Sequence, residues 1–181
     1  MEKTEIAVNP DIPKGALYAF YKRNGICEAG FGPDMAEVVL KHPCVSVGAF
    51  QKGELVGFAR ALFDGLSASI VEFSLDLRFQ DANELRNGCF VESDPHGIAK
   101  CMGKALLGEL RNRGCYFFSI SVWTPGEQEF YEALGFCENK GAREFVIDER
   151  PYVKKRSDPA KDSGRRGAPH YCGMKRERYR R

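Results

Sequence analysis

A glycine and two lysines surround the start of a predicted helix, in a pattern suited to an anion. Gly97 lets the backbone approach an oxygen atom closely, and Lys100 and Lys104 would add positive charge. Backbone amides at a helix start meet the positive end of the helix dipole. The segment consists of His96, Gly97, Ile98, Ala99 and Lys100. It could hold a diphosphate, although a glycine before a helix is also common as a simple turn, and His96 could be a base, a phosphate donor or a loop residue.

Glu72 lies among apolar neighbours in an alternating segment, Ser67 to Phe79. Partial burial would raise its pKa toward the working range, where a carboxylate can take a proton through water. Asp76 falls on the same predicted face, with Ile70 and Ser74, and competes for this role. An exposed or ion-paired Glu72 fits the pattern equally well.

Short helices and a hairpin are predicted before this segment. Residues 14–23 and 34–41 have apolar side chains three or four positions apart, which indicates two amphipathic helices. The β-rich runs 45–50 and 54–63 flank the compact turn at residues 51–53, which predicts a hairpin.

A polar excursion and a regular helix follow the alternating strand. Within the excursion, Cys89-Phe90-Val91 could form an extra short strand. Residues 98–113 keep their apolar positions on one helical face, and Gly114 closes this helix. Cys115 to Trp123 is almost wholly apolar, which predicts a parallel or central strand covered on both faces.

The C-terminal third contains one more predicted helix and a basic segment. Glu127 to Leu134 forms the helix, which Gly135 ends, and residues 143–147 and 170–175 could supply two last strands. A single domain over residues 1–181 is expected, in which the segment 150–181 could provide a loop and the last strand.

Composition is that of an ordinary globular domain, with 43% hydrophobic and 29% charged residues. The N-terminus has no apolar stretch, and no segment is long enough for a membrane span, so neither a signal peptide nor a span is expected. Seven cysteines show no CxxC spacing and no clustering with the three histidines. A reduced, cytoplasmic chain without a structural metal is the simplest interpretation.

Charge is distributed unevenly along the chain. Residues 1–153 hold 16 Lys and Arg against 22 Asp and Glu, whereas residues 154–181 hold 11 against 3. Such a basic tail could bind nucleic acid or an acidic partner, although charged termini are more often simply solvated. The acidic residues 1–153, in contrast, favour a cationic ligand. The sequence does not decide between an acidic and a cationic binding partner.

Three segments resemble one known family. GELVGFARAL matches the second strand of the hairpin, GIAKCMGKALLGELRNRGC matches a cofactor loop with its helix, and EFYEALGF matches a segment near the end. Over roughly residues 36–150 the chain resembles the GCN5-related N-acetyltransferase (GNAT) family. The resemblance implies an α/β fold with a mixed, mostly antiparallel sheet of six to seven strands and about four helices.

The family's cofactor loop has Gln or Arg, two residues, Gly, one residue, and Gly or Ala. This pattern falls on Asp94, Gly97 and Ala99, so an acid stands where the family usually has Gln or Arg. Beside a pyrophosphate this carboxylate would be repulsive unless it points away. A register that ends at Gly103 is an alternative, but Gly97 and Ala99 keep two small residues at the helix start.

The resemblance also implies where the cofactor arm lies. In such proteins two neighbouring strands splay apart, and pantetheine lies between them like an added strand. One strand would be Cys115 to Trp123, and the other either Ser67 to Phe79 or Cys89 to Ser93. The longer segment is the better central strand.

Chemical roles follow from the same resemblance. Tyr131 would stand near the thioester sulfur as general acid, since a phenol is protonated at neutral pH; packing beside Phe130 and Phe136 is its alternative role. Glu72 would be the base on the fourth strand. Thr124 occupies the position of an asparagine that contacts the cofactor arm, and its hydroxyl could do part of that work.

These expectations describe an enzyme that transfers an acetyl group from acetyl-CoA directly to a primary amine of a small molecule or protein. A CoA-binding module without catalysis and a nucleic-acid-binding protein that uses the basic tail are the alternatives. The sequence leaves open whether the chain forms a homodimer.

Overall fold

The computed structural model describes residues 3–27, 31–42 and 44–141 of the chain. Five strands, four α-helices and one 3-10 turn follow one another within these residues. They are β1 (Glu5–Val8), α1 (Lys14–Arg23), α2 (Pro33–Lys41), β2 (Val45–Gln51), β3 (Glu54–Phe63), β4 (Ser67–Leu75), η1 (Leu77–Phe79), α3 (Ile98–Asn112), β5 (Phe117–Ser119) and α4 (Pro125–Ala133).

The strands form one mixed sheet in the order β1-β2-β3-β4-β5. Neighbours from β1 to β4 are antiparallel, and β5 joins β4 in parallel. This arrangement confirms a mixed, mostly antiparallel sheet flanked by four helices. The described residues form five strands, fewer than the six to seven expected, and residues 143–147 and 170–175, predicted as the last two strands, lie outside the described residues.

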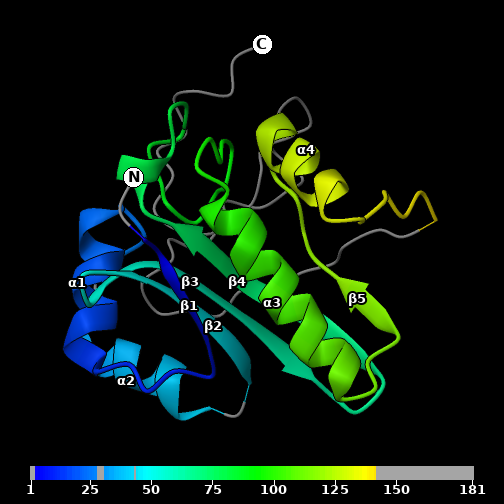
Figure 1. The fold of residues 1–181 in the computed structure, drawn as a ribbon, viewed down its shortest axis with the longest axis horizontal. Coiled ribbons are helices and arrows are strands. Elements are labelled where there is room, and N and C mark those ends of the chain that lie inside the picture. The colour runs from blue at the N-terminus through cyan, green and yellow to red at the C-terminus, as the bar shows by residue number, and fades with distance from the viewer. Residues whose placement is uncertain (1–2, 28–30, 43, 142–181) are drawn as a thin grey trace, which may run out of the picture.

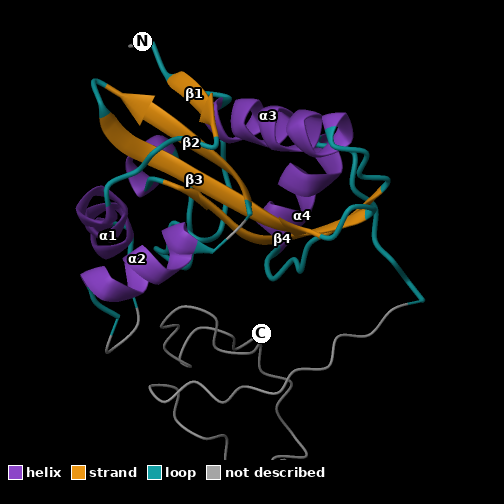
Figure 2. Ribbon diagram, turned by 90° about the horizontal axis from the view of Figure 1, so that it is seen from below, coloured by secondary structure: helices purple, strands orange, loops and turns teal. Residues whose placement is uncertain are grey.

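Helices cover both faces of the sheet. Helix α3 packs across β1 to β4 on one face, and α1 contacts β3 from the other. Figure 2 shows α3 and α4 on one side of the strands and α1 with α2 on the opposite side. Each side has its own group of buried apolar side chains, so the sheet separates two hydrophobic cores.

Spacing of apolar residues explains why α3 docks on the sheet. Ile98, Met102, Leu106 and Leu110 recur every four residues and are all buried. Glycine permits a close approach of the sheet, because a Cβ on Gly57 would lie 2.5 Å from the Met102 sulfur. The start of α3 is therefore held firmly over the strands.

Truncating the middle of this helix should have a large effect on stability. Leu106 is 0% exposed, so Leu106→Ala is expected to lower the free energy of unfolding by about 2–5 kcal/mol. Urea denaturation followed by circular dichroism measures the change. Lys104→Ala on the exposed face of α3 is the control and should change stability by less than about 0.5 kcal/mol.

Three local expectations need correction. The first strand, Glu5–Val8, lies in a segment in which no strand was predicted, and Cys89-Phe90-Val91 forms no strand. The strand predicted over 115–123 is limited to Phe117–Ser119 and forms the sheet edge among the described residues. It is not covered on both faces, because Phe117 is 59% exposed.

Within the described residues, every helix is too short or too polar to cross a membrane.

Candidate active site

The short strand β5 pairs only with the beginning of β4. Ser67, Ala68 and Ser69 face residues 117–119, after which β4 continues to Leu75 while the chain leaves β5 toward α4 (Figure 1). Beyond Ser69, this edge of β4 has no strand partner among the described residues. A splayed pair of parallel strands therefore lies beside α4, and its longer member is the segment preferred from the sequence.

A β-bulge changes which side chains of β4 share a face. Ile70 faces Ala61 and Glu72 faces Arg60, which leaves Val71 as an extra residue in β4. Ile70 lies in the core beside α3. Glu72, in contrast, contacts Tyr21 of α1 on the opposite side of the sheet. The expectation that Ile70 and Glu72 share a face was wrong because the bulge interrupts the alternation.

Glu72 is held by three side chains on the α1 side of the sheet. Its carboxylate accepts hydrogen bonds from Tyr21 Oη at 2.7 Å, Arg60 Nε at 2.9 Å and Ser74 Oγ at 3.3 Å. Burial raises the pKa of Glu72, and the bonds from Arg60 and Tyr21 act against that rise. The side chain is 10% exposed, so it combines a raised pKa with a fixed position.

Asp76 is poorly suited to the role of base. Burial opposes its ionised form, but hydrogen bonds from Arg78 and Arg23 outweigh this effect and lower the pKa of Asp76 to about 2. Its Oδ1 also accepts from the Arg78 amide and caps the 3-10 turn. Of the two acids weighed for this face, Glu72 therefore has the more suitable environment.

Tyr131 lies on the α3 side of β4 in an aromatic cluster. It is 2% exposed, and its ring centroid is 5.0 Å from that of Phe130, 5.8 Å from that of Phe136 and 6.1 Å from that of Phe73. Burial, with smaller effects of Glu127 and Cys89, raises the pKa of Tyr131 well above its ordinary value. The phenol therefore stays protonated over the neutral range. It belongs to the same core as Ile98 at the start of α3.

Neighbouring residues of β4 contact the two sides of the sheet. Phe73, next to Glu72, packs on Tyr131 with ring centroids 6.1 Å apart. Tyr21 donates to Glu72 on one side, and Tyr131 stands on the other. The predicted acid and base therefore approach the same part of β4 from opposite faces.

Helix α3 begins after a glycine in the left-handed conformation. Gly97 is the N-cap residue with φ of +70°, and no atom lies within 4 Å of the place of a Cβ there. The amides of Ile98 and Ala99 have no acceptor among the described residues, whereas the Lys100 amide donates to Asp94 Oδ2 at 2.8 Å. His96 is exposed, and its ring lies edge-on to Phe79.

Thr124 caps helix α4. Its hydroxyl accepts from the Glu127 amide at 3.2 Å, and Glu127 Oε2 accepts from the Trp123 amide at 3.1 Å. This reciprocal pattern is a capping box. The oxygen of Thr124 is thus engaged in ordering the start of α4, and only its hydroxyl hydrogen remains for another acceptor.

Glu127 should make stability depend on pH. Burial raises its pKa from 4.5 to about 7 against the Trp123 and Thr124 amide bonds, with a smaller effect from Glu92. A carboxyl whose pKa is higher in the folded state stabilises at low pH, and this contribution is lost as pH rises from 4.5 through about 7. Glu127→Gln keeps an acceptor and is expected to remove this pH dependence, which amounts to about 3 kcal/mol. Urea denaturation from pH 4 to pH 8 tests it, and equal slopes in both proteins would contradict it.

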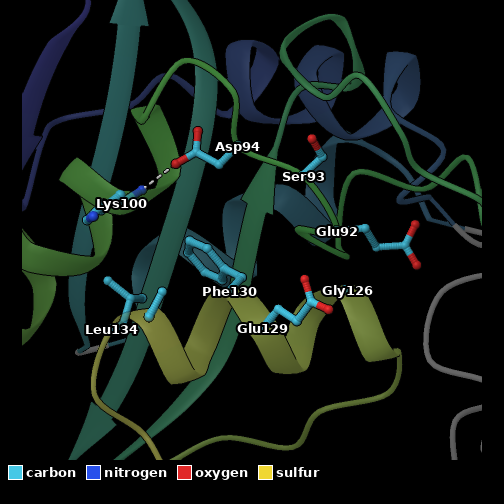
Figure 3. A pocket seen from close by; sticks show the side chains of 9 residues that line it. Glu92, Ser93, Asp94, Lys100, Gly126, Glu129, Phe130 and Leu134 are labelled. Carbon is cyan, nitrogen blue, oxygen red and sulfur yellow. Dashed lines mark hydrogen bonds between the residues drawn. The ribbon is translucent and has the colours of Figure 1, made fainter.

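A cavity of about 390 Å³ lies between the start of α3 and helix α4. Its lining comprises Glu92, Ser93, Asp94, Lys100, Gly126, Glu129, Phe130, Ala133 and Leu134. Figure 3 shows Asp94 and Lys100 on one wall and Phe130 with Leu134 on the other. Among the described residues, three acids and one cation line the cavity, so this part of its wall is acidic. Phe130 connects it to Tyr131.

Solved structures of acetyltransferases share this architecture. An acetyltransferase of the GNAT family from Streptococcus pneumoniae matches with a TM-score of 0.62 at 18% identity, over 82% of this chain and 99% of that chain. An aminoglycoside N-acetyltransferase in complex with CoA matches with a TM-score of 0.57 at 18% identity, over 83% and 97%. Glucosamine-6-phosphate N-acetyltransferase from Arabidopsis thaliana gives 0.58 at 12% identity, over 81% and 100%.

The chain has the GNAT fold. No family model and no curated protein matches the sequence, so the likeness is one of structure at low identity. The predicted site residues lie on both sides of β4 in this fold. His96 to Lys100 stand at the start of α3, Thr124 caps α4, and Tyr131 lies on α4, whereas Glu72 lies on the α1 side of β4.

Sequence reasoning missed four contributors to this region of the GNAT fold. Tyr21 and Arg60 bind Glu72 from distant parts of the chain, and Phe73 packs on Tyr131. No local pattern reveals such contacts. Glu127 could have been found, because threonine followed three residues later by glutamate before an apolar helix is the sequence pattern of a capping box.

Proposed function

We propose that this protein is an N-acetyltransferase that transfers an acetyl group from acetyl-CoA directly to a primary amine of a small molecule or protein. The observation that carries the proposal is the splay between β4 and β5, with Tyr131 on one side of β4 and Glu72 on the other. The relative crystallised with CoA has the same fold, which supports the choice of cofactor.

The residues present suit most of this cofactor. The amides of Ile98 and Ala99 and the open space above Gly97 suit a diphosphate at a helix start. The edge of β4 after Ser69, for which the described residues supply no strand partner, could bond to pantetheine as a further strand does. The carboxylate of Asp94, which accepts from the Lys100 amide, does not suit an anionic ligand.

Acetyl transfer needs two proton movements that these side chains could perform. The amine nitrogen attacks the thioester carbonyl carbon, the C–S bond breaks, and the departing thiolate takes a proton. Tyr131 is protonated at neutral pH because burial raises its pKa, so its phenol is the proposed donor. Glu72, whose pKa burial also raises, is proposed to take the amine proton through water on the other side of β4.

A release assay for CoA thiol tests the proposal. Purified protein with acetyl-CoA is offered polyamines, aminoglycosides, amino sugars, amino acids and peptides, and calorimetry measures CoA binding in parallel. We expect amine-dependent thiol release with at least one class and an N-acetylated product in the mass spectrum. CoA binding without turnover on any amine would instead identify a binding module. Failure to bind CoA would refute both.

Nucleic-acid binding by the basic tail stays a prediction from sequence, because residues 154–181 lie outside the described part of the chain.

A further inference from the structure

The start of α3 has a carboxylate of its own. Asp94 Oδ2 accepts from the Lys100 amide at 2.8 Å, and the Asp94 carbonyl accepts from the Gly97 amide at 3.1 Å. The two bonds close a turn that holds the acid against the helix terminus, and Figure 3 shows the first of them. Asp94 thus takes one of the amides that an external anion would use.

The second oxygen of this carboxylate is poorly satisfied. Asp94 Oδ1 is buried and has no hydrogen-bond donor among the described residues. Glu92 and Glu129 line the same cavity, and Lys100 is the only cation that lines it within the described part of the chain. A buried acceptor without a partner is costly, and neighbouring negative charges increase that cost. A helix-capping role explains the position of Asp94 Oδ2 but does not explain the buried Oδ1.

We propose that Asp94 acts as an internal competitor of the cofactor's diphosphate and thereby lowers the protein's affinity for CoA. This inference rests on the cofactor site of the proposed function. Two amides, those of Ile98 and Ala99, remain for the ligand, and they lie within a few residues of a fixed negative charge. Near a protein surface, like charges a few ångströms apart repel by more than the free energy of a tenfold change in affinity.

A purely structural role for Asp94 predicts the opposite sign. A carboxylate at a helix start stabilises the helix through its hydrogen bond and the dipole. If capping were its whole role, neutralising Asp94 would loosen the start of α3 and weaken CoA binding or leave it unchanged. The direction of the change in affinity therefore separates the two roles.

Calorimetry on three proteins with two ligands provides the test. Asp94→Asn keeps an oxygen that can accept from the Lys100 amide and removes the charge. Glu129→Gln is the matched control, because it removes one charge from the same cavity without contacting an amide at the start of α3. CoA is compared with pantetheine, which lacks the diphosphate, and circular dichroism checks that each variant is folded.

We expect Asp94→Asn to bind CoA at least about tenfold tighter than the parent protein and pantetheine equally well. The gain should shrink as salt is added, and Glu129→Gln should gain less than about threefold. Equal or weaker CoA binding by Asp94→Asn would overturn the inference, as would an equal gain in Glu129→Gln. If CoA bound to none of the three proteins, the proposed function would fail as well. Tight binding by the parent without a gain would refute the inference alone.

Discussion

Tyr131→Phe is expected to lower kcat for acetyl transfer at least about a hundredfold and to leave CoA affinity unchanged. A positioned general acid contributes about that much, and the substitution removes only the hydroxyl that donates the proton. The three aromatic neighbours of Tyr131 contact its ring, so a phenylalanine should keep the packing. Steady-state thiol release, with the best amine from the screen, measures the loss.

Stability separates this acid role from simple packing. The Tyr131 hydroxyl has no hydrogen-bond partner among the described residues, so its removal should change the free energy of unfolding by less than about 1 kcal/mol. Tyr116→Phe is the matched control, because the Tyr116 side chain is 85% exposed and lies outside the aromatic cluster of Tyr131. Full activity in Tyr131→Phe would show that the phenol only packs. Equal losses in both variants would point to damage unrelated to proton transfer.

Regular periodicity made the helices beside the site predictable. In α3, apolar residues recur at every fourth position. This spacing predicts both a helix and the face of it that is buried. Gly114 and Gly135 have φ of +91° and +98°, as glycines that end helices do, and both were assigned to helix ends from sequence. Strong local signals of this kind survive the tertiary context.

The faces of β4 could not be predicted, because alternation assumes an unbroken ladder. One extra residue at Val71 changes the relation between all positions before and after it. Tyr21 is 51 residues from Glu72 in sequence, and no local pattern indicates that it covers this acid. The position of Glu72 in the fold could be predicted, but its hydrogen-bond partners could not.

Asp94 shows a different limit of sequence reasoning. Its departure from the family pattern indicates repulsion toward a phosphate, but composition cannot show where the carboxylate points. Its bond to the Lys100 amide depends on the left-handed conformation of Gly97, which turns the chain back over the helix start. The residue type at position 94 predicted repulsion of a phosphate. Only the backbone conformation showed that the Asp94 carboxylate points at the start of α3.

Glu72→Gln is expected to lower kcat/KM about a hundredfold at neutral pH and to remove the acidic limb of its pH profile. A base must be ionised, so activity in the parent should rise with pH through the pKa of Glu72, which burial raises above 4.5. Glutamine stays neutral at every pH and cannot take the proton. The glutamine oxygen can still accept hydrogen bonds from Tyr21 and Arg60. The decrease in kcat/KM should therefore come mainly from the missing base and not from a changed structure.

Tyr21→Phe provides a test that a purely structural Glu72 would fail. The bond from Tyr21 lowers the pKa of Glu72, so its removal should raise that pKa and move the acidic limb to higher pH. Maximal activity above the limb should change little, because the carboxylate remains. If the limb stays in place in Tyr21→Phe and persists in Glu72→Gln, the carboxylate serves Arg60 as an ion-pair partner, and the base must be sought elsewhere.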